Sequence, residues 1–146
     1  MPFLVVVQLA STLYMVGLIW FVQLVHYPLF SAVGIKEFPA YEQSHQRLTT
    51  WAVGPMMLIE LVSTFALPFR MPVGSATWLA WLGLALLIAI WLSTWLLQVP
   101  AHHSLQVNGF SHTVHSRLVR TNWIRTVAWS VRGLIALAIT MSCIQS

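Results

Sequence analysis

The chain contains very little charge. Only 7% of its 146 residues are charged and three are acidic, whereas 58% are hydrophobic. A soluble domain carries about 25% charged residues, so this chain has too little charge to cover a surface that faces water. Because lipid must then contact most of the surface, the composition predicts an integral membrane protein whose first partner is the lipid bilayer.

Other absences exclude several functional classes. The seven Lys and Arg residues form no run, so the chain lacks the basic stripe of a nucleic-acid-binding protein, and no nucleic-acid partner is expected. The single cysteine excludes an internal disulfide and a cysteine metal cluster. The sequence also contains no phosphate-binding glycine loop and no serine-hydrolase motif.

Four apolar segments are long enough to cross a bilayer, which takes roughly 20 residues of helix. The expected spans cover about residues 3–27, 38–68, 76–98 and 116–144. The first apolar run is too long for the apolar region of a signal peptide, so we expect it to be a spanning helix. The predicted fold class is all-α, an integral membrane antiparallel four-helix bundle in which residues 1–146 form a single domain.

Prolines mark the positions where these helices are expected to start, end or bend. Pro28 is expected to close the first span and Pro100 the third. Pro39 suits the first turn of a helix, so the second helix should begin near Phe38. Pro55 lies inside the second span and is expected to kink it.

Four crossings place both termini on one side of the membrane, the terminal side, and the loops at 29–48 and 99–117 on the other, the loop side. The terminal side carries only Arg70. Four basic residues lie on or near the loop side: Lys36, Arg47, Arg117 and Arg120. The positive-inside rule therefore predicts cytoplasmic loops and termini on the opposite side.

All six histidines fall on the loop side: His26, His45, His102, His103, His112 and His115. Histidine is the commonest metal ligand, and facing helices of a bundle can bring such ligands to one point. Because His26, His45 and His102 come from three different helix ends at similar depth, we predict that they bind a metal ion or a haem. The other three are expected to bond only water, lipid headgroups or backbone.

Glu42 is a fourth predicted metal ligand, because it lies three residues before His45 and therefore on the same helical face. This Glu-x-x-His step occurs in di-iron bundles, but three acidic residues are too few to complete such a site. A mononuclear iron or copper site, or a haem with axial histidines, is more consistent with the available ligands. The alternative is that the histidines only bond their interfacial surroundings.

Glu60 lies near the middle of the second span, where an ionisable residue is costly and is a candidate for function. It follows His45 by the same fifteen residues that separate Arg117 from Arg132. Since the second and fourth helices run in one direction, Glu60 and Arg132 should share a depth and form an ion pair. Glu60 is then either a catalytic or proton-relay residue or half of a pair that only sets the helix register.

Asn122 and Arg125 lie one turn apart in the fourth span and should face the same side. With Thr126 they form a polar stripe, and such stripes face the bundle interior or a wet cavity. Gln23 and Gln98 lie at comparable depth and could line that cavity. We therefore predict Asn122 and Arg125, together with Glu60, as catalytic residues; the alternative is interhelical hydrogen bonding worth about 1 kcal/mol per contact.

Two short motifs carry a family resemblance. Val99-Pro100-x-His102-x-x-Leu105, followed by Asn122-Trp123-Ile124-Arg125-Thr126, resembles the small four-span membrane proteins that include fungal anthrone oxygenases. In those proteins Asn more often stands at the position of His102, and the order of Trp and Asn is reversed. The resemblance covers mainly the second half of the chain. It implies a four-helix membrane bundle and oxidation of an aromatic or hydrophobic substrate.

These observations predict a membrane oxidoreductase or oxygenase with its metal or haem near the loop side. A hydrophobic small molecule such as a quinone, polyketide or lipid would enter from the bilayer. One alternative is a non-catalytic subunit or pigment-binding accessory that contacts a membrane protein partner or a second copy of itself. Another is a proton-coupled carrier built on Glu60, which four spans without a broken helix pair make less consistent.

Overall fold

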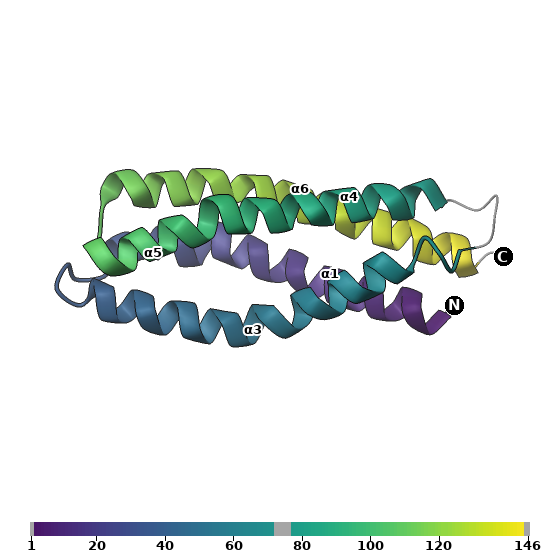
Figure 1. Ribbon diagram of the computed structural model, residues 1–146, viewed down its shortest axis with the longest axis horizontal. Coiled ribbons are helices and arrows are strands. Elements are labelled where there is room, and N and C mark those ends of the chain that lie inside the picture. Colours follow the sequence, from purple (N-terminus) through teal and green to yellow (C-terminus); the bar gives the residue numbers. More distant parts are fainter. Residues whose placement is uncertain (1, 72–76, 145–146) are drawn as a thin grey trace.

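The computed structural model describes residues 2–71 and 77–144. In this part of the chain every regular element is helical, and the helices form an elongated antiparallel bundle with both termini at one end (Figure 1). Four helical rods are long and apolar enough to cross a membrane: Pro2–Ala32, Phe38–Ala66, Thr77–Asn108 and His112–Ile144. The predicted all-α four-helix membrane bundle is thus confirmed, although residue 76 of the third expected span lies outside the described residues.

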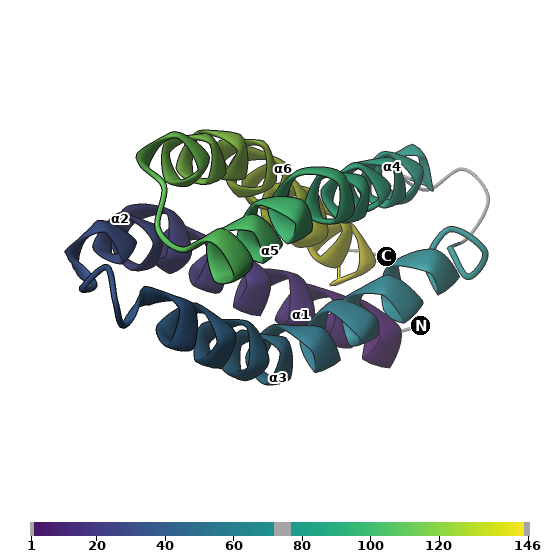
Figure 2. The ribbon, with the colours of Figure 1, turned by 60° about the vertical axis from the view of Figure 1, so that its left-hand side comes forward.

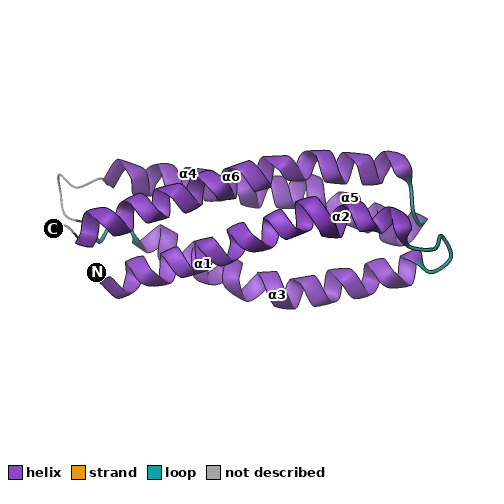
Figure 3. Ribbon diagram, turned by 180° about the vertical axis from the view of Figure 1, so that it is seen from behind, coloured by secondary structure: helices purple, strands orange, loops and turns teal. Residues whose placement is uncertain are grey.

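The first and third rods are assembled from several helical pieces, whereas the second and fourth are the single helices α3 (Phe38–Ala66) and α6 (His112–Ile144). The first rod contains α1 (Pro2–Phe21), the π-helical segment η1 (Val22–His26), α2 (Tyr27–Leu29) and the 3₁₀ turn η2 (Phe30–Ala32). The third contains α4 (Thr77–Ser93), the π-helical segment η3 (Thr94–Gln98) and α5 (Val99–Asn108). Short loops at residues 33–37 and 109–111 join the first rod to the second and the third rod to the fourth, both at the end of the bundle away from the termini (Figure 3).

Each π-helical segment ends two residues before a proline. A proline inside a helix has no N–H to donate, and its ring clashes with the carbonyl four residues earlier. The wider π turn relieves this conflict: the N–H of Tyr27 bonds the carbonyl of Val22, five residues back. Both helices therefore continue past Pro28 and Pro100 to Ala32 and Asn108, and the expectation that these prolines end them was wrong.

The second rod has the start and the internal proline that the sequence predicted. It begins at Phe38 with a proline in its first turn, as predicted. Pro55 lies inside α3, whose ribbon bends near the middle of the helix (Figure 1). Neighbouring helices can satisfy the carbonyl that such a proline leaves without a partner.

The interior of the bundle is more polar than its surface. Glu42, Glu60, Arg125 and Arg132 are all buried, whereas large apolar side chains such as Trp51 are exposed. This distribution reverses that of a soluble protein and fits a chain surrounded by lipid. The fold therefore places four of the ten charged side chains between the helices.

Candidate metal centre and lateral cavity

Three histidines converge near the loop-side end of the bundle, where Figure 2 shows α5 and the first turns of α3 side by side. His26 ends η1, His45 lies in α3 and His102 in α5. Nε2 of His26 is 2.8 Å from Nδ1 of His45, and the ring centroids of His45 and His102 are 5.2 Å apart. The sequence-based expectation that these rings approach one another from different rods agrees with the structure.

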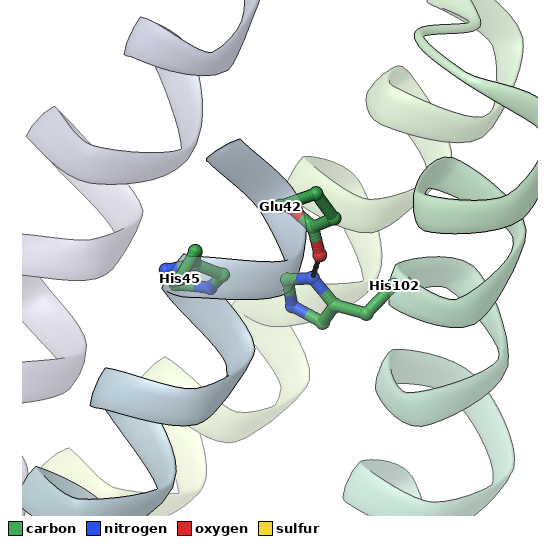
Figure 4. Close-up of side chains that lie close together, drawn as sticks. All are labelled: Glu42, His45 and His102. Carbon is green, nitrogen blue, oxygen red and sulfur yellow. Dashed lines mark hydrogen bonds and ion pairs between the residues drawn. The ribbon is translucent and has the colours of Figure 1, made fainter. Parts of the chain in front are cut away.

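Glu42 contacts one of these histidines, His102. Its Oε1 lies 2.5 Å from Nδ1 of His102 (Figure 4). Glu42, His45 and His102 can each offer one ligand atom, and these atoms lie within 4.8 Å of one another. Two histidines and one carboxylate form the facial ligand set of non-haem iron(II) oxygenases.

The second carboxylate oxygen of Glu42 is the feature that most suggests a cation. The side chain is fully buried, yet Oε2 has no hydrogen-bonding partner among the described residues. Leaving a buried, charged acceptor without a partner is costly. A metal ion held by Glu42, His45 and His102 would satisfy that oxygen, so the residues present fit such an ion.

His26 lies beside the ligand set rather than within it. Nδ1 of His45 contacts Nε2 of His26 and also the hydroxyl of Thr49, at 3.1 Å. These two contacts occupy Nδ1, so Nε2 is the nitrogen of His45 that is suited to hold an ion. His26 is therefore placed to orient His45, as outer-shell partners of metal-binding histidines do.

Tyr27 is a site residue that the sequence reasoning missed. Its hydroxyl lies 2.9 Å from Nε2 of His102 and accepts a hydrogen bond of 3.2 Å from Arg125. A continuous chain of contacts therefore runs from Glu42 through His102 and Tyr27 to Arg125. The only signal for Tyr27 in the sequence was its position between His26 and Pro28. The structure shows that the π-helical segment ends at His26, directly before it.

The polar stripe of the fourth rod faces the interior, as predicted. Arg125 donates from Nε to Oδ1 of Asn122 at 2.9 Å, and Asn122 donates to Oε1 of Gln23 at 2.8 Å. Gln98 lies nearby, with its Oε1 3.5 Å from Arg125. Asn122 is held between Arg125 and Gln23, so its side chain positions the guanidinium.

Glu60 and Arg132 form the predicted ion pair, with 2.9 Å between Oε1 and a guanidinium nitrogen. Thr12 donates to Oε1 at 2.9 Å, and the indole of Trp129 donates to Oε2 at 3.0 Å. A terminal nitrogen of Arg132 also donates to the carbonyl of Gly83. Because both carboxylate oxygens already have partners, this geometry favours a role in helix register over one in catalysis.

A cavity of about 400 Å³ lies next to the histidine cluster. Tyr27, His45, His102 and Arg125 line its polar end, and most of its remaining wall is apolar. The exposed side chains of Leu58 on α3 and Val99 on α5 also belong to its lining. The cavity therefore opens through the side of the bundle, where a membrane would place lipid, and Glu60 does not line it.

The three remaining histidines lie outside the cluster. His103 and His112 are exposed. The ring of His115 is buried and bonds the backbone carbonyl of Tyr27 through Nε2 at 2.7 Å. The backbone bond of His115 agrees with the expectation for these three residues, but the rings of His112 and His115 also contact Phe110, with centroids 4.9 and 5.4 Å away.

No family model, curated protein or solved structure matches this chain. The resemblance to the anthrone oxygenase family thus stays a prediction from two short motifs.

Proposed function

We propose that this protein is a membrane-embedded oxidoreductase that binds one iron or copper ion and oxidises a hydrophobic substrate, with molecular oxygen as the oxidant. The ion would be held by Glu42, His45 and His102. The observation that carries the proposal is the free Oε2 of the fully buried Glu42. A carboxylate oxygen of Glu42 and a ring nitrogen from each of two histidines lie within 4.8 Å of one another, beside a lateral cavity. Such a set leaves metal positions open for further ligands.

The spacing of the rings favours a single ion over a haem. A haem with two axial histidines stands between their rings. The centroids of His45 and His102 are only 5.2 Å apart, and Glu42 contacts His102 at the same place. No macrocycle fits between these rings unless α3 and α5 separate.

The bound ion would supply the redox chemistry, and the chain's own residues would manage protons. If Nδ1 of His102 holds the ion, Nε2 carries the proton and donates to the hydroxyl oxygen of Tyr27. The Tyr27 hydroxyl can then donate its own proton in the cavity to the oxidant as it is reduced. Arg125, which also donates to Tyr27, would stabilise the negative charge that remains on the phenolate oxygen.

The membrane orientation belongs to the same proposal. The loop side carries Lys36, Arg47, Arg117 and Arg120, whereas the terminal side carries Arg70 alone. The positive-inside rule then puts the histidine cluster near the cytoplasmic surface. A quinone, polyketide or lipid dissolved in the bilayer would reach it through the lateral opening.

Metal analysis of the detergent-purified protein tests the proposal. After reconstitution with Fe(II) or Cu(II), we expect one ion per chain in the wild type. The variants Glu42→Ala, His45→Ala and His102→Ala should lose it, whereas His112→Ala, which changes an exposed ring outside the cluster, should retain it.

Two outcomes would reject the proposal. One is a wild-type protein that binds neither metal after reconstitution. The other is metal binding that survives in all three ligand variants. A colourless, metal-free protein that copurifies with a larger membrane complex would instead favour the non-catalytic subunit or pigment-binding accessory.

A further inference from the structure

Arg125 is a buried cation that no acidic side chain of the protein neutralises. The chain has three acidic residues. Glu42 pairs with His102 and Glu60 with Arg132, and the third, Glu37, is exposed. Arg125 therefore has no acidic counter-ion among the described residues. Because an uncompensated charge in a bundle interior is costly, we expect a ligand to supply one.

The nitrogens of Arg125 differ in the length of their hydrogen bonds. Nε and one terminal nitrogen contact Oδ1 of Asn122, at 2.9 and 2.5 Å. The other terminal nitrogen reaches only the hydroxyl of Thr94, at 3.4 Å. Arg125 and Thr94 both line the cavity. One edge of the guanidinium is therefore weakly occupied and lies beside the space that a ligand would enter.

Trp91 is another hydrogen-bond donor among the residues that line the cavity. It precedes Thr94 by three residues on the third rod, and both residues belong to the cavity lining. Its indole nitrogen is buried and has no acceptor among residues 2–71 and 77–144. A buried N–H without an acceptor is unusual in a native structure, so the missing acceptor is expected to come from a ligand.

We infer that the cavity binds an apolar organic anion whose charged oxygen is held by Arg125 and Trp91. Met15, Ile19 and Met57 line the cavity with apolar side chains, and the flexible methionines suit the body of such a molecule. Two membrane-soluble sources share this chemistry: a long-chain carboxylate and the ionised form of an alkyl hydroxyquinone. The inference rests on the proposed function, for which it names the substrate class.

Binding to the metal-free protein in neutral detergent separates this inference from the metal proposal. The probes are palmitate and its methyl ester, and an alkyl hydroxynaphthoquinone and its O-methyl ether, titrated by calorimetry at a pH that ionises both acids. We expect at least one anion to bind about tenfold or more tightly than its neutral partner, since charge-assisted hydrogen bonds are the strong ones. The tighter anion identifies the source.

Three variants localise the binding. Arg125→Gln should abolish the preference for the anion. Because this change could impair folding, Trp91→Phe provides a milder test that removes only the indole donor and should weaken the anion several-fold. Its matched control is Trp95→Phe, which changes an exposed neighbour of Trp91 and should leave affinity unchanged.

A steric variant tests the location independently of charge. Gly54 lines the cavity, and a Cβ added there meets no atom within 4 Å. Gly54→Ala should therefore fold and bind normally, whereas Gly54→Leu should fill the cavity and exclude both members of each probe pair.

The possible results separate the two proposals. Equal affinity for anion and neutral partner, or a preference that persists in Arg125→Gln and Trp91→Phe, overturns the inference. Selective anion binding by a protein that takes up no metal would support the inference and reject the proposed metal centre. Metal uptake without any preference for the anion would support the metal centre and reject the inference.

Discussion

The hydroxyl of Tyr27 lies 2.9 Å from Nε2 of His102, and this contact joins the proposed metal-ligand set to Arg125 in the wall of the lateral cavity. The other ring nitrogen of His102 faces Glu42, and Arg125 donates to the same hydroxyl. A change in protonation at the carboxylate end can therefore reach the cavity through two side chains. Tyr27 directly follows the π-helical segment of the first rod, and His102 follows that of the third by four residues.

Removal of the Tyr27 hydroxyl should slow the reaction without removing the metal. In Tyr27→Phe, His102 and Arg125 lose their shared partner, while Glu42, His45 and His102 remain. We expect unchanged metal content and a fall of about 10²-fold or more in metal-dependent oxygen consumption with the tightest-binding anion, because a positioned proton donor contributes on that scale.

Tyr14→Phe is the matched control for this substitution. The Tyr14 hydroxyl donates to the backbone carbonyl of Ala52, away from the cluster. Its loss should leave both metal content and rate unchanged. Equal rates in Tyr27→Phe and the wild type would show that the hydroxyl transfers no proton in the slow step.

Substitution of His26 should weaken metal binding without abolishing it. His26 contacts His45 but lies outside the set of three ligands, and the loss of an outer-shell partner typically costs about 10–100-fold in metal affinity. In a competition titration with a chelator, we expect that decrease for His26→Ala, no binding for His45→Ala and wild-type affinity for His103→Ala. If His26→Ala also loses the metal completely, His26 is a direct ligand.

The Glu60–Arg132 pair should contribute to stability through its balance of charge. Glu60→Gln leaves the buried guanidinium of Arg132 without a counter-charge. Arg132→Met leaves the buried carboxylate of Glu60 without one. Breaking a buried pair in this way costs about 3–5 kcal/mol. We expect the double variant Glu60→Gln/Arg132→Met to be more stable than either single variant, as measured by reversible unfolding in mixed detergent.

Metal content, anion affinity and activity of the same variants distinguish a role of Glu60 in helix register from one in proton transfer. If Glu60 only sets the helix register, the double variant should keep metal content and anion affinity at wild-type values. A loss of activity in a stable, metal-loaded double variant would show instead that Glu60 takes part in proton transfer.

Hydropathy and spacing were sufficient to predict the bundle and its deep ion pair. Long apolar runs must form helices in lipid, because every backbone N–H and carbonyl needs a partner within its own segment. Once the second and fourth helices run in one direction, equal separations along the chain imply equal depth. Glu60 and Arg132 could therefore be predicted to pair, because each lies the same number of residues after His45 and Arg117, respectively.

The arrangement around the cluster could not be predicted in the same way. Pro28 and Pro100 suggested helix ends, yet π turns carry both helices onward. One residue inserted into a helix rotates all later side chains by about 100°, so a π turn decides which of them face the interior. Tyr27 was missed for this reason, and His26 could not be distinguished from a direct ligand.

The sequence by itself determined that the chain crosses a membrane four times and gathers its histidines at one end, because composition sets the solvent and an even number of crossings sets the side. Only the tertiary structure decided that Glu42, His45 and His102 meet, that Tyr27 and Arg125 continue this cluster into a cavity, and that Trp91 has no acceptor there. Those relationships depend on how each helix is rotated about its axis. Packing between rods determines that rotation, and no single segment encodes it.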